Sequence, residues 1–310
     1  MERAGHKPDS DTVQAWSKFK TGMSEAKGEQ KSTETLSFRC DCERCRFMRG
    51  RIHFSPFTFH PNQLQINFIG TKLEVLRGRI MTKGIFVTAT GTDVGKTFVS
   101  ALLVKKLRDF GLNCGYFKPA LSGAEMVDGK LVPGDCAYVL KTAGLTEVEP
   151  MSCASYVFKT AVSPHLAAQI EGREIKKEKI LQDFQHKKSE YDYLVTEGAG
   201  GIICPFNMSD DNRILLEDVI KLLGLDVVVV ASAELGTINY TYLTVHYLKS
   251  IGIEVKGIIL NHYDENNIMC RDNLVQVEKL TGIKVLATVK DGEKDLRIDK
   301  NEILSIFKEI

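Results

Sequence analysis

The feature that most constrains the fold is a regular alternation of apolar runs and stretches of helical period from Gly84 onward. Six apolar, β-branched runs read as strands, at 84–89, 114–119, 191–198, 225–232, 253–261 and 283–289. Stretches of helical period lie between several of them, for example at 96–111, 214–224 and 238–252. Strands that are apolar throughout and alternate with helices indicate a parallel sheet covered on both faces. We therefore predict an α/β fold with a doubly wound, mainly parallel sheet, in which ligands bind at the carboxyl ends of the strands.

The first 80 residues do not share this pattern. Their beginning is rich in Lys, Glu, Ser, Thr and Gly and has little periodicity, which favours disorder. Cys40, Cys42 and Cys45 are clustered, but their C-x-C-x-x-C spacing is not that of a standard zinc finger, and no second cysteine pair follows. We expect residues 1–80 to be a disordered extension, or a leader upstream of a true start at Met81, and residues 81–310 to form the folded domain. Metal binding by the three cysteines is the less favoured alternative.

Composition and charge exclude few classes of protein. The net charge of +1 points to no particular partner, and no apolar run approaches the ~20 residues of a membrane span. The chain begins without the apolar segment of a secretory signal. Its other five cysteines are scattered, which is typical of reduced thiols in a cytosolic protein. We expect a cytoplasmic protein that binds neither membrane nor nucleic acid.

The stretch TATGTDVGKT (88–97) lies between a predicted strand and a predicted helix, which is the context of a phosphate-binding loop. Thr90 stands where a strict Walker A loop has its first glycine. The physical requirement is backbone N–H groups at a helix N-terminus and a glycine where the backbone meets the phosphate, which Gly95 supplies. Lys96 then reaches the terminal phosphates and the Thr97 hydroxyl binds Mg²⁺. The alternative, a plain Gly-rich turn before a helix, is less consistent with this context.

Three further charged residues follow predicted strands or precede predicted helices. Lys118, in FKPALSG, is either a solvated lysine at a strand end or a group that reaches an anion. Glu197 follows an apolar strand and precedes glycines, which suits a Mg²⁺ ligand acting with Thr97. Asp135 precedes a helical pattern, and local sequence favours a helix N-cap for it over a metal ligand.

Taken together, these motifs resemble the dethiobiotin synthetase family. Seven of them occur in the order of that family: VTATGTDVGKT, YFKPALSG, GDCAYVL, VSPHLAAQIEG, VTEGAGGIICP, ELGTINYTYLT and GIILNHYD. The resemblance covers residues 81–310 and none of residues 1–80. It implies a P-loop NTPase-like three-layer fold and an ATP- and Mg²⁺-dependent cyclo-ligase of biotin synthesis. Such an enzyme joins CO₂ to 7,8-diaminononanoate through a carbamate and a carbamic-phosphoric anhydride, and releases dethiobiotin, ADP and phosphate.

The resemblance also implies roles for individual residues. Lys118 and Lys96 are the expected catalytic lysines. The implied nucleotide site comprises Asp93, Val94, Gly95, Lys96, Thr97, Phe98, Asp135, Glu197, Gly198, Ala199, Gly200 and Asn261, with Asn261 on the adenine. The implied Mg²⁺ ligands are Thr97, Asp135 and Glu197, which replaces the N-cap role for Asp135. The implied substrate site comprises Ser122, Leu235, Gly236 and Asn239, the last three contributed by the partner subunit of a homodimer.

Two departures and two rival classes bear on this interpretation. Asp93 stands where the family often has Glu, and the chain reads LATVKDGEKD where the family commonly has Gly-x-Ile-Pro beside the base. Partition ATPases carry a signature lysine where this chain has Gly91, and cobyrinic-acid-type synthases add an amidotransferase domain for which the chain has no room. The family ligase is the interpretation that these features favour.

Overall fold

The computed structural model describes residues 35–39, 49–53 and 81–310. The chain divides into two compact units, Met1–Arg79 and Ile80–Ile310. In the first, β1 (Thr35–Arg39) pairs antiparallel with β2 (Arg49–His53). Cys40, Cys42 and Cys45 lie outside the described residues, so both the disorder and the metal binding considered for residues 1–80 stay predictions.

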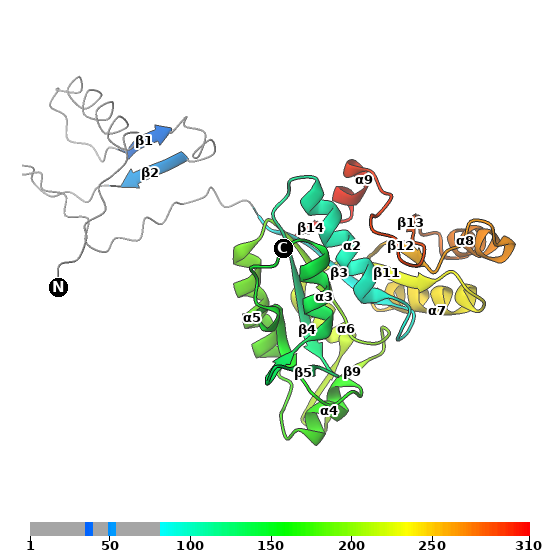
Figure 1. Ribbon diagram of the computed structural model, residues 1–310, viewed down its shortest axis with the longest axis horizontal. Helices are drawn as coiled ribbons and strands as arrows, with labels where there is room; N and C mark the ends of the chain where they lie inside the picture. The colour runs from blue at the N-terminus through cyan, green and yellow to red at the C-terminus, as the bar shows by residue number, and fades with distance from the viewer. Residues whose placement is uncertain (1–34, 40–48, 54–80) are drawn as a thin grey trace, which may run out of the picture. The chain divides into compact units, whose positions relative to one another are not determined.

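The second unit is built on one large sheet (Figure 1). Its parallel strands are β3 (Lys83–Ala89), β4 (Cys114–Leu121), β7 (Ala154–Val157), β8 (Tyr193–Glu197), β11 (Val227–Ser232), β12 (Val255–Asn261) and β13 (Val285–Thr288). They lie in the order β13-β12-β11-β3-β8-β4-β7, and β14 (Lys308–Glu309) adds a short antiparallel pairing to the start of β3. All six predicted strands are present. Two strands of the sheet are not among the predicted ones: the parallel strand β7, which follows the 3-10 turn η1 (Pro150–Cys153), and the short antiparallel strand β14.

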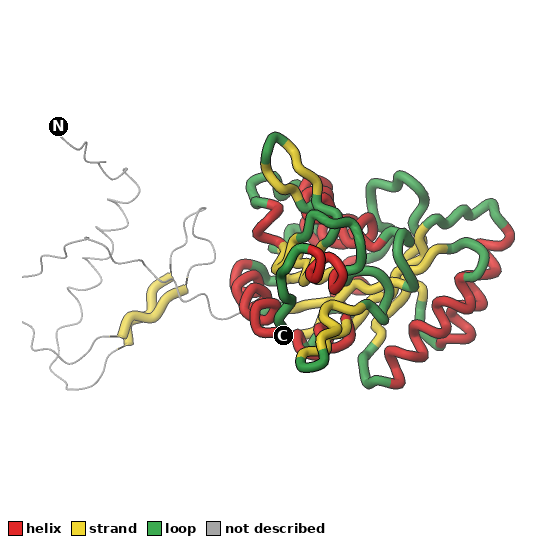
Figure 2. The backbone as a smooth tube through the Cα atoms, turned by 90° about the horizontal axis from the view of Figure 1, so that it is seen from below, coloured by secondary structure: helices red, strands yellow, loops and turns green. Residues whose placement is uncertain are grey.

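Helices cover both faces of this sheet (Figure 2). One face is packed by α5 (Lys177–Glu190), α6 (Leu216–Leu223), α7 (Thr237–Ser250) and α8 (Ile268–Thr281). The other is packed by α2 (Lys96–Asp109), α3 (Gly134–Thr142) and α9 (Lys300–Ser305). Successive side chains of a strand point to opposite faces of the sheet. Phe86 packs in the core on the face covered by α5 to α8, and Val87 packs in the core on the face covered by α2, α3 and α9. The predicted three-layer α/β fold is therefore confirmed.

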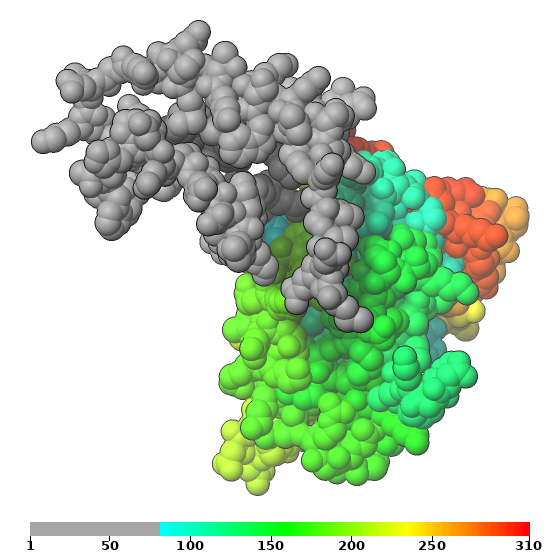
Figure 3. All heavy atoms as spheres, turned by 60° about the vertical axis from the view of Figure 1, so that its left-hand side comes forward, coloured from blue at the N-terminus to red at the C-terminus, as the bar shows by residue number. Residues whose placement is uncertain are grey.

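Smaller elements project from the ends of the sheet. The hairpin of β5 (Glu125–Val127) and β6 (Lys130–Val132) joins β4 to α3, and a second hairpin consists of β9 (Pro205–Ser209) and β10 (Asn212–Leu215). The short helix α4 (Pro164–Ile170) follows β7. Figure 3 shows a face of the molecule on which the green segments, which include α3, α4 and α5, lie at the surface. Within the described ranges, no helix is long and apolar enough to cross a membrane.

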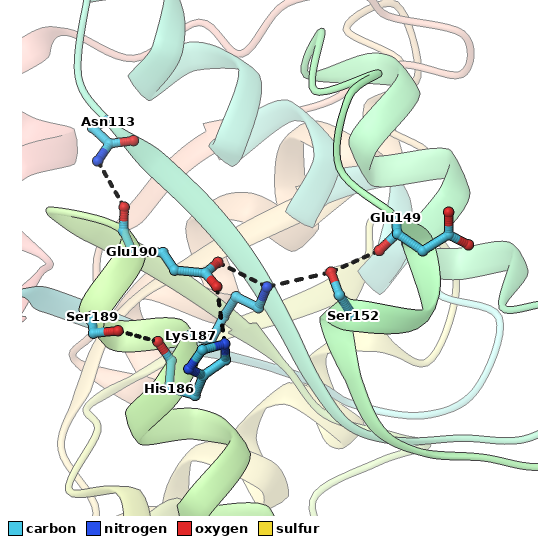
Figure 4. A network of polar contacts seen from close by, with 7 residues as sticks. All are labelled: Asn113, Glu149, Ser152, His186, Lys187, Ser189 and Glu190. Carbon is cyan, nitrogen blue, oxygen red and sulfur yellow. Dashed lines mark hydrogen bonds and ion pairs between the residues drawn. The ribbon is translucent and has the colours of Figure 1, made fainter. Parts of the chain in front are cut away.

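A network of polar contacts around a buried lysine joins the segments that precede β4, β7 and β8 (Figure 4). Lys187 near the end of α5 is 3% exposed, and its Nζ lies 2.9 Å from Glu190 Oε2 and 3.4 Å from Ser152 Oγ. The Asn113 side chain, just before β4, donates to the carbonyl oxygen of Glu190 at 3.1 Å. Because the strands are parallel, this network lies at their amino ends, on the opposite side of the sheet from their carboxyl ends.

Candidate active site

The phosphate-loop sequence forms the connection between β3 and α2 at the centre of the sheet. The helix starts at Lys96, its N-cap is Gly95, and its first turn contains no acidic residue. The positive end of the helix dipole and the free N–H groups of the first turn therefore face the loop, and no carboxylate of the helix itself competes for them. Such an arrangement favours a bound anion.

Gly95 is required at its position for two reasons. Its φ is 88°, in the left-handed region that side chains rarely adopt. A Cβ atom there would lie 2.1 Å from Asn261 Nδ2. Asn261, at the carboxyl end of β12, is 2% exposed and donates from Nδ2 to the Val94 carbonyl oxygen at 3.1 Å. In this structure Asn261 thus supports the loop from behind, and its predicted contact with adenine stays a prediction.

Lys96 folds back over the loop that precedes it. Its Nζ donates to the Gly91 carbonyl oxygen at 2.9 Å, and the residue is 8% exposed. Burial, followed by repulsion from Lys118, lowers the pKa of Lys96. The remaining predicted loop residues differ in exposure: Asp93 is exposed with a φ of 60°, whereas Val94 and Phe98 pack against the core on the α2 face. Lys118 is paired with carboxylates, whereas Lys96 contacts only a carbonyl oxygen, so Lys96 is the lysine for which a bound phosphate would be the counter-charge.

Glu197 is the polar centre of the site, at the carboxyl end of β8. Its carboxylate is fully buried, and three side chains donate to it. Thr97 Oγ1 lies 2.8 Å and Lys118 Nζ 2.5 Å from Oε1, and the Tyr116 hydroxyl lies 2.8 Å from Oε2. Burial, followed by the neighbouring Glu197 charge, raises the pKa of Tyr116 well above its usual value. Tyr116 is therefore a permanent hydrogen-bond donor to this carboxylate.

Lys118 connects the two predicted acidic metal ligands. Its Nζ lies 2.6 Å from Asp135 Oδ2 as well as 2.5 Å from Glu197 Oε1, and the residue is 3% exposed. Burial alone would lower the pKa of Lys118, but the two carboxylates raise it overall. The lysine is therefore a permanent cation. Strand β8 separates β4 from β3, so Lys118 reaches the site across one intervening strand rather than from a neighbouring one.

Two local expectations differ from the structure. The strand that carries Lys118 continues to Leu121, because it gains β7 as a partner where β8 ends. The N-cap of α3 is Pro133, so Asp135 lies in the first turn and not at the cap that local sequence favoured. From the first turn its carboxylate points to Lys118, and its role as a metal ligand stays a prediction.

The donor set fits Mg²⁺. Thr97, Glu197 and Asp135 offer a hydroxyl and two carboxylates, the oxygen ligands that this ion prefers when phosphates and waters complete its shell. In the structure a cation, the Lys118 ammonium, already bridges the two carboxylates. No group of three or more His, Cys, Asp or Glu that could hold a metal occurs among the described residues.

The glycines after β8 lie beside the phosphate loop. The Gly198 N–H donates to the Val87 carbonyl oxygen at 2.9 Å, so the strand pairing continues past Glu197. Gly200 has a φ of 61°, and a Cβ on Gly201 would lie 3.5 Å from the Cα of Gly91. Ala199 is partly buried against the core. This close approach of two backbones places the predicted nucleotide-site residues Gly198, Ala199 and Gly200 next to the loop.

The predicted substrate residues are not all brought to this cluster. Ser122 directly follows β4, in a turn where the Gly123 N–H donates to the Thr160 carbonyl oxygen at 3.2 Å. Leu235 is 86% exposed, Gly236 is the N-cap of α7, and Asn239 is exposed on that helix. Within the described part of the chain, no side-chain hydrogen bond or ion pair joins these last three residues to Lys118, Asp135 or Glu197.

Tyr116 is the site residue that sequence reasoning missed. A tyrosine within an apolar strand reads as a core residue, and its ring does belong to the core on the α2 face. The available signal was its spacing, because residues two apart on a strand share a face and Tyr116 precedes Lys118 by two.

Comparison with known proteins gives consistent matches over the second unit. A family model described as an AAA domain matches residues 83–294. The ATP-dependent dethiobiotin synthetase BioD of Clostridium botulinum strain 657 is 47% identical over 74% of this chain and 100% of its own length. The enzyme of the same name from Clostridium novyi is 49% identical over 71% of this chain and 93% of its own. Among solved structures, a ParA family ATPase from Chlorobium tepidum covers 73% of this chain and 89% of its own with 15% identity and a TM-score of 0.42, too distant a likeness to bear on function.

Proposed function

Because the chain belongs to the dethiobiotin synthetase family of ATP-dependent ligases, we propose that it converts 7,8-diaminononanoate, CO₂ and ATP into dethiobiotin, ADP and phosphate. One amine of the diamine takes up CO₂ as a carbamate. A carbamate oxygen attacks the γ-phosphorus of ATP and displaces ADP, which gives a carbamic-phosphoric anhydride. The second amine then attacks the carbonyl carbon, closes the cyclic urea and expels phosphate.

The observation that carries this proposal is the position of Lys118. It is a buried cation at the carboxyl end of the sheet, held by Glu197 and Asp135 and adjacent to the phosphate loop through the Thr97–Glu197 hydrogen bond. The reaction needs positive charge where a carbamate and a transferring phosphoryl group meet, and it needs no nucleophilic side chain. A cation fixed before the substrates arrive stabilises both groups without reorganisation.

The phosphate loop and its lysine have the complementary task of binding ATP. Lys96, which now donates to the Gly91 carbonyl oxygen, is expected to exchange that contact for the terminal phosphates. The N–H groups of the first turn of α2 bind the same phosphates. Thr97, Asp135 and Glu197 are the residues that hold Mg²⁺, which when bound neutralises phosphate charge and orients the nucleotide.

A homodimer is the second part of the proposal. Leu235, just before α7, and Tyr240 and Leu243, in its first half, are 86%, 57% and 55% exposed. Apolar side chains exposed together typically mark an interaction surface. We expect this surface to meet a second copy, whose Leu235, Gly236 and Asn239 then receive the distal carboxylate of the diamine near Ser122.

The five described cysteines are free and buried, in keeping with the reducing cytoplasm that we expect as the compartment.

Purified protein tests the reaction directly. ATP consumption is expected only when 7,8-diaminononanoate and bicarbonate are both present, with dethiobiotin identified by mass spectrometry. ATP turnover that is indifferent to the diamine but stimulated by DNA or lipid would contradict the proposal and favour a nucleotide-switched binding protein.

A further inference from the structure

We propose that Tyr116 is a positioning residue for Glu197 and that its hydroxyl sets how strongly Mg²⁺ and ATP bind together. The proposal rests on the nucleotide and metal site of the proposed function, but not on the identity of the diamine. Tyr116 was not among the residues that the sequence or the family resemblance assigned to the site.

The sheet itself brings the two side chains together. Strands β4 and β8 are parallel, with Tyr116 opposite Val195 and Phe117 opposite Thr196. Residues two apart share a face, so Tyr116 and Glu197 point to the same side of neighbouring strands, with Glu197 two residues beyond the partner of Tyr116. The tyrosine ring is 1% exposed and packs in the core on the α2 face. Its position is therefore fixed by the fold and does not depend on any ligand.

The two carboxylate oxygens of Glu197 have different partners. Oε1 accepts from Thr97 and Lys118, the groups nearest the phosphate loop, whereas the Tyr116 hydroxyl is the donor to Oε2 at 2.8 Å. If Thr97 and Glu197 held Mg²⁺, the donors to Oε1 would have to rearrange, because the Thr97 hydroxyl would face the ion instead of the carboxylate. The bond from Tyr116 is the contact that need not change.

A carboxylate held at one oxygen presents the other in a fixed direction. Outer-shell hydrogen bonds of this kind orient metal ligands, and their loss typically lowers metal affinity by about 10- to 100-fold. Without the Tyr116 hydroxyl, Oε2 has no described donor, and the fully buried carboxylate is held only through the contacts of Oε1 with Thr97 and Lys118. Once those contacts rearranged, Glu197 would no longer be held toward the metal position beside Thr97.

The test is Tyr116→Phe, which removes only the hydroxyl. Isothermal titration of the full chain with the non-hydrolysable analogue AMP-PNP, in EDTA and across a Mg²⁺ series, gives nucleotide affinity and its dependence on Mg²⁺. We expect unchanged affinity in EDTA and about a tenfold higher Mg²⁺ concentration for half of the Mg²⁺-dependent gain. These are binding measurements, so they hold even if the diamine reaction of the proposed function fails.

Tyr156→Phe is the matched control. Tyr156 is 5% exposed on β7, and its hydroxyl accepts from the Lys176 backbone N–H at 2.9 Å, without a contact to Glu197. This variant should keep the wild-type Mg²⁺ dependence even if its melting temperature falls. A Tyr116→Phe protein with wild-type Mg²⁺ dependence, or with an equal loss of affinity in EDTA, would overturn the proposal. If the variant is unstable at 25 °C, the same titrations at 10 °C, below its melting temperature, give the answer.

Discussion

Lys118 and Glu197 form a buried ion pair at the carboxyl edge of the sheet, with Nζ 2.5 Å from Oε1. Neither charge is solvated, since the residues are 3% and 0% exposed. Burying such a pair costs free energy unless further polar groups contact both charges. Here Asp135 forms a second ion pair with Lys118, and the Thr97 hydroxyl donates a hydrogen bond to Glu197. Two carboxylates therefore hold the Lys118 ammonium in a buried position at the carboxyl ends of the strands.

The first prediction follows from that pair. Lys118→Gln should lower kcat by about 10²- to 10³-fold, because a preorganised charge is lost where phosphoryl transfer occurs. ATP affinity should remain nearly unchanged, since the phosphate loop and Lys96 are intact. Steady-state kinetics and AMP-PNP titration measure the two quantities separately. Lys179→Gln, which removes an exposed lysine paired with Asp183 on α5, is the control and should change neither. Equal losses of binding and turnover in Lys118→Gln would contradict the assigned role.

Much of this edge of the sheet could be predicted from the sequence. The six strands of the prediction were recognisable because buried parallel strands are apolar on both faces. In such a sheet, the residues that follow the strands converge, which is why Lys118, Glu197 and the phosphate loop could be expected together. This convergence follows from the parallel direction of the strands, which the alternation of strands and helices in the sequence predicts.

What the sequence could not provide was lateral strand order and non-local contacts. The insertion of β8 between β3 and β4 depends on pairing between segments far apart in the chain. Strand β7 has only four residues and follows a 3-10 turn, too short for a periodic signal. Tyr116 looks like any core tyrosine until Glu197 is placed beside it. The support of Gly95 by Asn261 is likewise invisible without the fold.

The second prediction concerns the lysine network at the other edge of the sheet (Figure 4). Glu190→Gln should lower the free energy of unfolding by about 1–2 kcal/mol, because it leaves the buried Lys187 without its counter-charge while Glu190 itself is partly solvated. Lys187→Met should cost less, since it removes the buried charge and keeps apolar volume. Urea unfolding gives both values, and kcat should be unchanged in both variants. A larger loss in Lys187→Met than in Glu190→Gln would contradict this account.

The third prediction concerns a thiol beside the site. Burial, only partly offset by Lys96 and Lys118, raises the pKa of Cys204 from 9.0 to about 11. At pH 8 only about one thiol in a thousand is then ionised, so iodoacetamide should label Cys204 about 100-fold more slowly in the folded protein than in urea. Because the pKa of Cys204 is higher in the folded protein than in the unfolded chain, its thiol stabilises the fold below pH 9. This contribution is lost as the pH rises toward 11. Mass spectrometry of the alkylated peptide measures the rates, and equal rates would show that the thiol is not protected.

The final prediction concerns the close fit between Gly95 and Asn261 in the phosphate loop. Gly95→Ala places a Cβ 2.1 Å from Asn261 Nδ2 in a residue with a φ of 88°. Either the loop or Asn261 must move, so ATP affinity should fall at least about tenfold, the effect of losing one charge-assisted hydrogen bond. Gly111→Ala is the matched control, because its φ is 77° but no atom lies within 4 Å of the added Cβ. It should cost about 1 kcal/mol of stability from strain alone and leave ATP affinity unchanged. If both variants bound AMP-PNP equally well, the contact between Gly95 and Asn261 would have no part in shaping the nucleotide site.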